Sequence, residues 1–195
     1  VSQWSDGDDA VRYGIAQQVD EACRSIGFMQ ITGHGIPPTV IDGFASAIDE
    51  FEFAGSYRRG KETVGDLDVL VASTDADCVM DRFAAFPAIV STTARGETKM
   101  SVRLEKEFQV DLRVVPVESF GAALQYFTGS KEHNVVVRGL AKKKQLKINE
   151  WGVFRTDGDE DVRVAGETET DVYGSIGLPV FAPEIRENRG EFEWA

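Results

Sequence analysis

Two aspartates separated by one residue inside an apolar run constrain most strongly how this chain can fold. Asp66 and Asp68 stand in the run 66–72, whose composition is typical of a strand. The residues between and after them, Leu67 and Val69, are apolar. Because successive strand residues point to opposite faces, both carboxylates project from one face while the apolar residues pack on the other. Two such carboxylates repel each other unless a cation lies between them, so the run predicts a metal site on a strand.

A third carboxylate, that of Asp111, stands between Val110 and Leu112 in a second apolar run, 108–115. A neighbouring strand would bring it beside the first two and complete a site for two metal ions about 3.5–4 Å apart. Carboxylate oxygens suit Mg²⁺, and such a site carries out phosphoryl or nucleotidyl transfer. We therefore expect Asp66, Asp68 and Asp111 to converge within a few ångströms, with at least one raised pKa in the absence of metal.

The turn before the first of these strands combines small and basic residues. Gly55 and Ser56 permit close approach of the backbone to a phosphate group, and Arg59 can donate to phosphate oxygens. The segment 55–71 therefore predicts a strand, a tight glycine-rich turn and a second strand, with an anion site beside the metal site.

Periodicity along the remaining chain predicts an α+β fold. Strand patterns occupy 52–57, 66–72, 88–94, 99–104, 108–115, 147–154 and 161–165. Helical patterns occupy 75–85, 117–127 and 131–145, and the N-terminal region is expected to form helix 8–25, strand 27–33 and helix 38–51. The short connections favour mostly antiparallel pairing within a mixed sheet.

Charge is unevenly distributed over the 195 residues, whose net charge is −12. Eight acids and two bases give residues 1–51 a charge of −6, and eleven acids and three bases give residues 157–195 a charge of −8. Residues 55–147 carry +3, from fifteen bases and twelve acids. The net charge of −12 argues against a simple nucleic-acid-binding protein, whereas the positive charge of residues 55–147 is compatible with phosphate contacts. Without a membrane-spanning run or a secretory signal, we expect a cytoplasmic protein with free thiols at Cys23 and Cys78.

Taken together, these motifs resemble the palm of family X DNA polymerases. Gly55-Ser56, nine residues and Asp66-x-Asp68, followed by an apolar-flanked aspartate, is the signature of the polymerase-beta-like nucleotidyltransferases. Further matches follow in order at 94–99, 110–113, 126–130, 148–150 and 171–187. The resemblance covers about 140 residues. It implies a polymerase-beta-like nucleotidyltransferase palm, with a mixed sheet and helices, at 52–117, and a small α/β thumb at 118–195.

The resemblance also implies roles for individual residues. Asp66, Asp68 and Asp111 would be catalytic and would hold two Mg²⁺ or Mn²⁺ ions. The residues implied to bind the nucleotide are Gly55, Ser56, Arg59, Gly65, Tyr126, Phe127, Gly129 and Asn134. Arg113 and Arg138 would contact DNA. Because this family often has a non-proline cis peptide at the thumb hinge, we expect unusual backbone geometry at Gly129-Ser130.

Residues 3–50 resemble a different family. Residues 27–37 and the helices on either side are similar to the N-terminal segment of 2-oxoglutarate and iron(II) dependent oxygenases. An oxygenase iron site needs two histidines and a carboxylate, and the only histidines, His34 and His133, lack an acid two residues later. Oxygenase activity is therefore not expected. We interpret 1–51 as an oxygenase-like helix-strand-helix segment joined within 49–53 to a polymerase palm, as in a recombinant or engineered chimera.

The function expected from these resemblances is template-dependent DNA synthesis of the gap-filling repair type. Its substrates would be deoxynucleoside triphosphates and primed or gapped DNA, bound weakly because the small DNA-binding domains that usually precede this palm are not found ahead of it. One alternative is a catalytically inactive chimera that uses the palm as a scaffold. Another is a minimal nucleotidyltransferase acting on a small molecule or a protein, against which the thumb motif 126–130 argues. The oligomeric state is not predicted.

Overall fold

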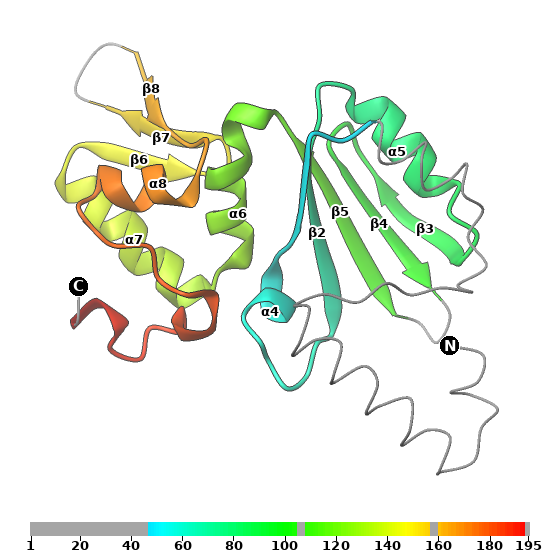
Figure 1. Cartoon of the computed structure of the whole chain (residues 1–195), viewed down its shortest axis with the longest axis horizontal. Helices are drawn as coiled ribbons and strands as arrows, with labels where there is room; N and C mark the ends of the chain where they lie inside the picture. The colour runs from blue at the N-terminus through cyan, green and yellow to red at the C-terminus, as the bar shows by residue number, and fades with distance from the viewer. Residues whose placement is uncertain (1–46, 105–107, 157–159, 194–195) are drawn as a thin grey trace, which may run out of the picture. The chain divides into compact units, whose positions relative to one another are not determined.

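A computed structural model describes residues 47–104, 108–156 and 160–193 (Figure 1). By its internal contacts the chain divides into two units, Val1–Ile41 and Asp42–Ala195, and every described residue belongs to the second. The expected helix 8–25, strand 27–33 and most of helix 38–51 lie outside the described residues. Glu50 and Phe51, the last residues of that expected helix, instead begin strand β1 (Glu50–Phe53).

A five-stranded mixed sheet forms the first half of the described chain. Its strands are β1, β2 (Asp66–Ala72), β3 (Ile89–Arg95), β4 (Lys99–Leu104) and β5 (Gln109–Val115). Their order in the sheet is β1-β2-β5-β4-β3. Strands β2 and β5 are parallel, and all other neighbouring pairs are antiparallel. The expectation of an α+β fold with a mixed, mostly antiparallel sheet is confirmed.

One face of this sheet is apolar over its inner strands β2, β5 and β4. Leu67, Val69 and Val71 of β2 alternate with the aspartates and join a core with Val110, Leu112 and Val114 of β5. Helix α5 (Ala76–Ala84) adds Val79 and Met80 to this core. Asp75 caps the helix by accepting from the backbone N–H of Cys78 at 2.9 Å. Strict alternation on β2 and β5 thus fixes which face carries the carboxylates.

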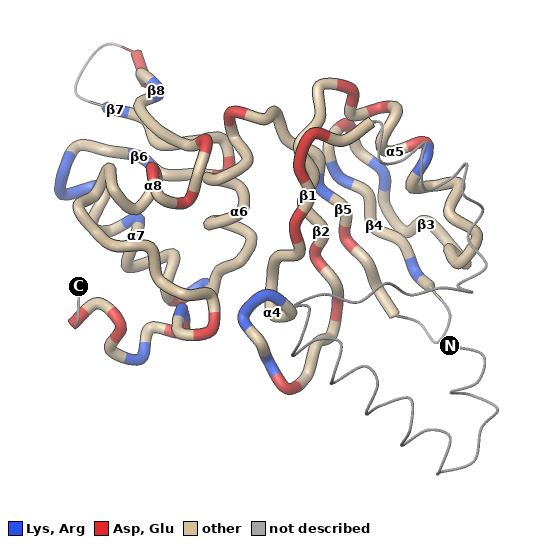
Figure 2. Tube along the Cα trace, in the orientation of Figure 1, with Lys and Arg blue, Asp and Glu red and all other residues tan. Residues whose placement is uncertain are grey.

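The opposite face is divided into a polar part and an apolar part. Where β2 and β5 begin, it carries Asp66, Asp68 and Asp111; Figure 2 marks acidic positions in red on both strands. Where they end, Leu70, Ala72 and Val115 pack with Phe120, Ala123 and Leu124. The last three belong to helix α6 (Phe120–Thr128), so this helix packs on the apolar part of the face.

The second half of the described chain combines helices with a small antiparallel sheet. It contains a 3₁₀ turn at Val117–Ser119, α6, α7 (Lys131–Lys143), α8 (Glu169–Ser175) and 3₁₀ turns at Pro183–Ile185 and Glu191–Glu193. Its strands are β6 (Leu146–Asn149), β7 (Gly152–Arg155) and β8 (Val162–Ala165), paired in that order. Val137, Val153, Val172 and Tyr173 lie in its buried core.

Close backbone packing holds α6 against the segment before α8. A Cβ atom on Gly121 would lie 2.2 Å from the Thr168 backbone, so only glycine fits there. The N–H groups of Gly121 and Ala122 donate to the carbonyls of Glu167 and Gly166 at 3.0 and 2.9 Å. These bonds satisfy two of the N–H groups that the first turn of a helix leaves free.

Several local expectations are wrong. The strand expected at 52–57 ends at Phe53, and Gly55–Arg58 forms a short helix, α4, because Gly55 adopts a positive φ of 62° that turns the chain. The strand expected at 147–154 is two strands joined by a turn at Glu150-Trp151. Helix α8 had not been expected. Within the described residues no helix is long and apolar enough to cross a membrane.

Candidate active site

The sheet register places two of the three aspartates directly opposite each other. Asp68 on β2 pairs with Asp111 on the parallel neighbour β5, and Asp66 lies two residues earlier on the same face. Burial raises the pKa of the Asp68 carboxyl, and the negative charges of Asp66 and Asp111 raise it further. The prediction that at least one pKa of the set is raised is confirmed, with burial as the largest cause.

Neighbouring side chains balance the negative charge of the Asp111 carboxylate. The Lys99 Nζ lies 2.9 Å from its Oδ2, and the Gln109 side-chain amide donates to its Oδ1 at 2.9 Å. Burial works to raise the pKa of Asp111, but hydrogen bonds from Lys99, Ser101 and Gln109 outweigh it and hold the pKa below its usual range. An ammonium group thus compensates charge beside this carboxylate.

The expected convergence of the Asp66, Asp68 and Asp111 carboxylates on one metal site remains a prediction. Across residues 47–104, 108–156 and 160–193, no three Asp, Glu, His or Cys side chains form a group that could hold a metal ion. The sheet register places the Asp68 and Asp111 backbones side by side. The Asp111 carboxylate forms an ion pair with Lys99. The donors nevertheless suit a divalent cation, because hard oxygen ligands share one face and their mutual repulsion is only partly neutralised.

Gly55 makes room for one of these carboxylates. A Cβ atom at this position would lie 2.1 Å from Asp68 Oδ2, and the φ of 62° is one that other residues rarely adopt. The Ala54 N–H also donates to the Asp68 carbonyl at 2.9 Å. Sequence reasoning assigned the glycine to phosphate approach, whereas its close neighbour in the structure is an aspartate.

A cavity of about 370 Å³ lies against the two aspartates of β2. Its lining residues are Gly55, Ser56, Arg59, Asp66, Asp68, Tyr126, Phe127, Gly129, Ser130, Lys131, Asn134 and Arg138. Of the residues expected to bind nucleotide, Gly65 alone does not line it. Asp111 and Arg113 do not line it either. Ser130 and Lys131 do, although they had not been assigned a role; their position directly after Gly129 was the available signal.

The hinge between α6 and α7 forms one wall of this cavity. Gly129 ends α6 with a φ of 70°, and the Gly129–Ser130 peptide bond is cis, as expected. The Ser130 side chain caps α7 by accepting from the His133 N–H at 3.3 Å. Tyr126 and Phe127 precede the hinge with their rings edge to face, 5.1 Å apart. The aromatic pair and the hinge therefore lie on the same side of the cavity as Asn134.

Asn134 and Arg138 line the cavity but are engaged within the protein. The Asn134 amide donates to the Tyr126 carbonyl and accepts from the Gln125 side chain, both at 2.7 Å. The Arg138 Nε donates to the Asn134 carbonyl at 3.3 Å. Asn134 is therefore positioned by α6, and its contact with a nucleotide remains a prediction.

The guanidinium group of Arg113 lies over the Phe127 ring, 4.0 Å from its centroid. Its Nε is buried and has no hydrogen-bond partner among the described residues. The positive charge lowers the pKa of Asp68 against the effects that raise it. Arg113 thus connects the carboxylate face with the aromatic wall, and its contact with DNA remains a prediction.

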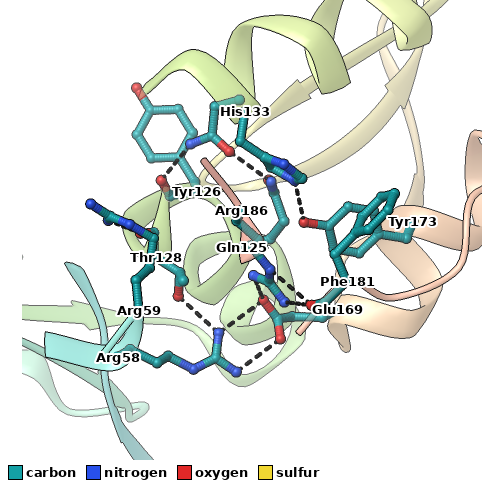
Figure 3. A network of polar contacts seen from close by, with 11 residues as sticks. Arg58, Arg59, Gln125, Tyr126, Thr128, His133, Glu169, Tyr173, Phe181 and Arg186 are labelled. Atoms are coloured by element: carbon teal, nitrogen blue, oxygen red, sulfur yellow. Dashed lines mark hydrogen bonds and ion pairs between the residues drawn. The ribbon is translucent and has the colours of Figure 1, made fainter. Parts of the chain in front are cut away.

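Arg58, the last residue of α4, and Arg59, directly after it, each pair with a glutamate from the second half of the described chain. Arg58 donates both terminal nitrogens to Glu169 at 3.0 and 2.9 Å, and Glu169 also receives Arg186 at 2.5 Å (Figure 3). Arg59 donates to the Thr128 carbonyl at 2.5 Å and to Glu187 at 2.9 Å. Sequence reasoning missed both glutamates, because ion pairs spanning 111 and 128 residues leave no local pattern.

His133 is fully buried and packs against Tyr173, Phe181 and Phe192 in the second half of the described chain. Its Nδ1 lies 2.8 Å from Glu191 and its Nε2 lies 2.8 Å from the Tyr173 hydroxyl. Burial lowers its pKa, although the Glu191 carboxylate opposes this.

The mixed sheet with aspartates on its parallel strands β2 and β5, followed by helices and a small antiparallel sheet, is consistent with a polymerase-beta-like palm and thumb. Family comparisons agree: residues 40–116 match the DNA polymerase beta palm and residues 123–187 match the DNA polymerase beta thumb. The palm and thumb part of the chain belongs to the family X DNA polymerases.

Three relatives show the extent of the match. The chain is 41% identical over 148 residues to the DNA polymerase/3'-5' exonuclease PolX of Bacillus subtilis, covering 75% of this chain and 26% of that protein. It is 31% identical over 159 residues to rat DNA polymerase lambda, covering 68% of this chain and 28% of that protein. It is 26% identical over 138 residues to the repair DNA polymerase X of African swine fever virus, covering 68% of this chain and 78% of that protein. It thus spans about a quarter of the length of the first two.

The N-terminal region matches another family. Residues 1–59 match the N-terminal segment of the non-haem dioxygenases of morphine synthesis. This match overlaps the palm match over residues 40–59 and ends before the carboxylate strand begins. The resemblance of the first fifty-one residues to oxygenases therefore agrees with the comparison.

Proposed function

We propose that the chain is a DNA-directed nucleotidyltransferase of the gap-filling repair type. The observation that carries the proposal is the single cavity that brings Asp66 and Asp68 together with Arg59 and the aromatic hinge. A cavity lined by carboxylates, cations and aromatic rings suits the metals, phosphates and sugar of a deoxynucleoside triphosphate. Family membership supports the same reaction.

Asp66, Asp68 and Asp111 would hold two Mg²⁺ or Mn²⁺ ions. Bound there, the ions supply positive charge that stabilises the attacking and leaving oxygens of an in-line displacement. The reaction forms a bond between a primer 3′-oxygen and the α-phosphorus, breaks the bond to the bridging oxygen and releases pyrophosphate. The hydroxyl proton passes to solvent.

The remaining lining residues would bind and orient the nucleotide. Arg59, with Ser56 beside it, would face the phosphates, since a guanidinium offers paired donors to phosphate oxygens. Tyr126 and Phe127 would pack on the sugar, and Gly129 lets the backbone come close to it. Asn134 and Arg138, one helical turn apart on α7, would face the base pair.

A gapped-primer extension assay tests the proposal. Purified full-length chain with a labelled gapped duplex, deoxynucleoside triphosphates and Mg²⁺ or Mn²⁺ should extend the primer by one nucleotide, and EDTA should abolish extension. The Asp111→Ala protein should be inactive while retaining the wild-type melting temperature within a few degrees. If the wild type extends the primer no more than Asp111→Ala does, the chain would instead be a catalytically inactive scaffold.

The N-terminal segment belongs to a second proposal. We infer that residues 1–51 are an oxygenase-derived segment joined to a palm at 52–117 and a thumb at 118–195. The two overlapping family matches support a junction near the start of β1. A chain beginning at residue 42 tests it: the same melting temperature and extension rate as the full chain would show that the segment contributes nothing to the palm.

A further inference from the structure

A second cavity adjoins the candidate nucleotide cavity and has a volume of about 790 Å³. It lies between the turn after α4 and the segment around the 3₁₀ turn Pro183–Ile185. Its lining residues are Ser56, Arg59, Gly60, Lys61, Glu62, Thr63, Glu184, Glu187 and Arg189. Ser56 and Arg59 line both cavities, so the two spaces meet at these side chains.

One carboxylate, that of Glu187, holds both cations at this boundary. Its Oε1 lies 2.9 Å from Arg59 Nε and 2.9 Å from Lys61 Nζ. Burial works to raise the pKa of the Glu187 carboxyl, but hydrogen bonds from Lys61 and Arg59 outweigh it and hold the pKa below its usual range. Glu187 is therefore ionised at neutral pH and neutralises part of the positive charge there.

The two partners of Arg59 differ in kind. The Thr128 carbonyl is a backbone group beside the hinge, and it fixes the direction of the guanidinium through a 2.5 Å bond. Glu187 is a side-chain anion, and a phosphate oxygen can take its place because both offer charge-assisted acceptors to a guanidinium. Loss of the Glu187 contact would thus free donors on Arg59 and Lys61 while the backbone bond keeps Arg59 oriented.

We propose that Glu187 is a resident counter-ion that the polyphosphate end of the substrate displaces from Arg59 and Lys61, and that the second cavity receives this end and the released pyrophosphate. The inference rests on the proposed function, which places the nucleotide phosphates at Arg59. Because the carboxylate competes for the same donors, it weakens polyphosphate binding and favours pyrophosphate release. Glu187 is a positioning residue that acts through Arg59.

Inorganic tripolyphosphate is a direct probe of this competition, because it carries the charge without sugar, base or DNA. We expect Glu187→Gln to bind tripolyphosphate about two- to tenfold more tightly than the wild type in calorimetric titration of the full chain, the size expected for partly screened ion pairs. Glutamine keeps an acceptor oxygen for Arg59 but lacks the charge. Pyrophosphate should also inhibit primer extension by this variant at a correspondingly lower concentration.

Glu184→Gln is the matched control. Glu184 lines the same cavity but, in the part of the chain that the structure describes, makes no ion pair with Arg59 or Lys61. We expect its affinity to rise less than that of Glu187→Gln, because the Glu184 change removes a charge from the cavity but releases no donor on Arg59 or Lys61. Equal or weaker binding by folded Glu187→Gln would overturn the proposal, since a purely structural ion pair gives no gain in affinity when removed.

A second measurement covers the case in which Glu187→Gln does not fold. Saturating tripolyphosphate should shift the ¹⁵N–¹H resonance of Arg59 Nε in the wild type, assigned by its loss in Arg59→Lys, because the bond to Glu187 is exchanged. An unchanged resonance would overturn the proposal. Primer extension with no difference between Glu187→Gln and Glu184→Gln refutes only the counter-ion role. Tighter polyphosphate binding without extension refutes only the proposed reaction.

Discussion

At the scale of single residues, Gly55 is the position where the smallest change has the clearest consequence. Its missing side chain lets the Asp68 carboxylate lie where a Cβ atom would meet an oxygen at 2.1 Å, and its φ is 62°. Both features have to be kept for the carboxylate to remain beside the cavity. The glycine therefore links the turn after β1 to the proposed metal site.

Gly55→Ala should lower the free energy of unfolding by about 1–3 kcal/mol, because alanine is strained at this φ and its methyl group displaces Asp68. Urea unfolding measures the change. Gly139→Ala on helix α7 is the control: a Cβ there meets nothing within 4 Å, and the change should raise stability by up to about 1 kcal/mol. A Gly55→Ala protein as stable as the wild type would contradict the close approach to Asp68.

At the scale of elements, α4 and α8 are joined by buried charge. Glu169 receives Arg58 from α4 and Arg186 from the C-terminal segment, and the Arg186 side chain is completely buried. Burial works to raise the pKa of Glu169, but hydrogen bonds from Arg58 and Arg186 outweigh it and hold the pKa below its usual range. Removing this carboxylate leaves a buried guanidinium without its anion.

Glu169→Gln should lower the free energy of unfolding at pH 7 by about 3–5 kcal/mol, as expected when one partner of a buried pair is lost. Because the folded pKa is depressed, the Glu169 contribution is present above the unfolded pKa of about 4.3 and is lost as pH falls through the folded pKa. Urea unfolding at pH 7 and at successively lower pH should therefore show the difference between variant and wild type shrinking below pH 4.3.

Asp161→Asn provides the contrast for this ion pair. Asp161 and Lys147 also pair at 2.9 Å, but their side chains are 44% and 55% exposed. Water and salt screen such a pair, so its loss should cost less than about 1 kcal/mol. Equal losses from Glu169→Gln and Asp161→Asn would show that the Glu169 network does not stabilise the fold.

Elements with a local pattern could be predicted from the sequence. The alternation Asp66-Leu67-Asp68-Val69 specified β2 and its two faces, and β5, α5 and α7 followed from similar periodicity. Helix α4 could not be predicted in this way, because its four residues, Gly55–Arg58, are too few to show a helical repeat of apolar side chains. The partners of the site arginines depend on chain folding over more than a hundred residues, which no local pattern records.

Side-chain competition also limited prediction of the site. The register of β2 and β5 brings Asp68 beside Asp111, as the sequence indicated. Lys99 lies on β4 opposite Arg113 of β5, which residue spacing could not predict. Its ammonium group forms an ion pair with the Asp111 carboxylate. Backbone proximity of acidic residues was therefore predictable, whereas the arrangement of their oxygens was not.

At the scale of the whole molecule, charge determines how the chain can meet DNA. The net charge is −12, and the acidic excess lies in residues 1–51 and 157–195, with the bases concentrated between them. Several of those bases are already committed: Arg58 and Arg59 bind glutamates, and Lys99 binds Asp111. The exposed lysines Lys142–Lys144 at the end of α7 form no ion pair among the described residues and remain for phosphate contacts.

We therefore expect weak and salt-sensitive DNA binding. With few phosphate contacts, the dissociation constant for a gapped duplex should fall in the range of non-specific binding, about 10⁻⁴–10⁻⁶ M, and nucleotide addition should be slow and distributive. Fluorescence anisotropy with a labelled gapped duplex at several salt concentrations measures both the affinity and its salt slope. Lys143→Ala should reduce the slope by about 1 if this lysine contacts one phosphate, whereas Lys147→Ala, whose ammonium pairs with Asp161, should change it less. Nanomolar binding at physiological salt would mean that an oligomer, or the N-terminal segment, provides a DNA-binding surface beyond these cations.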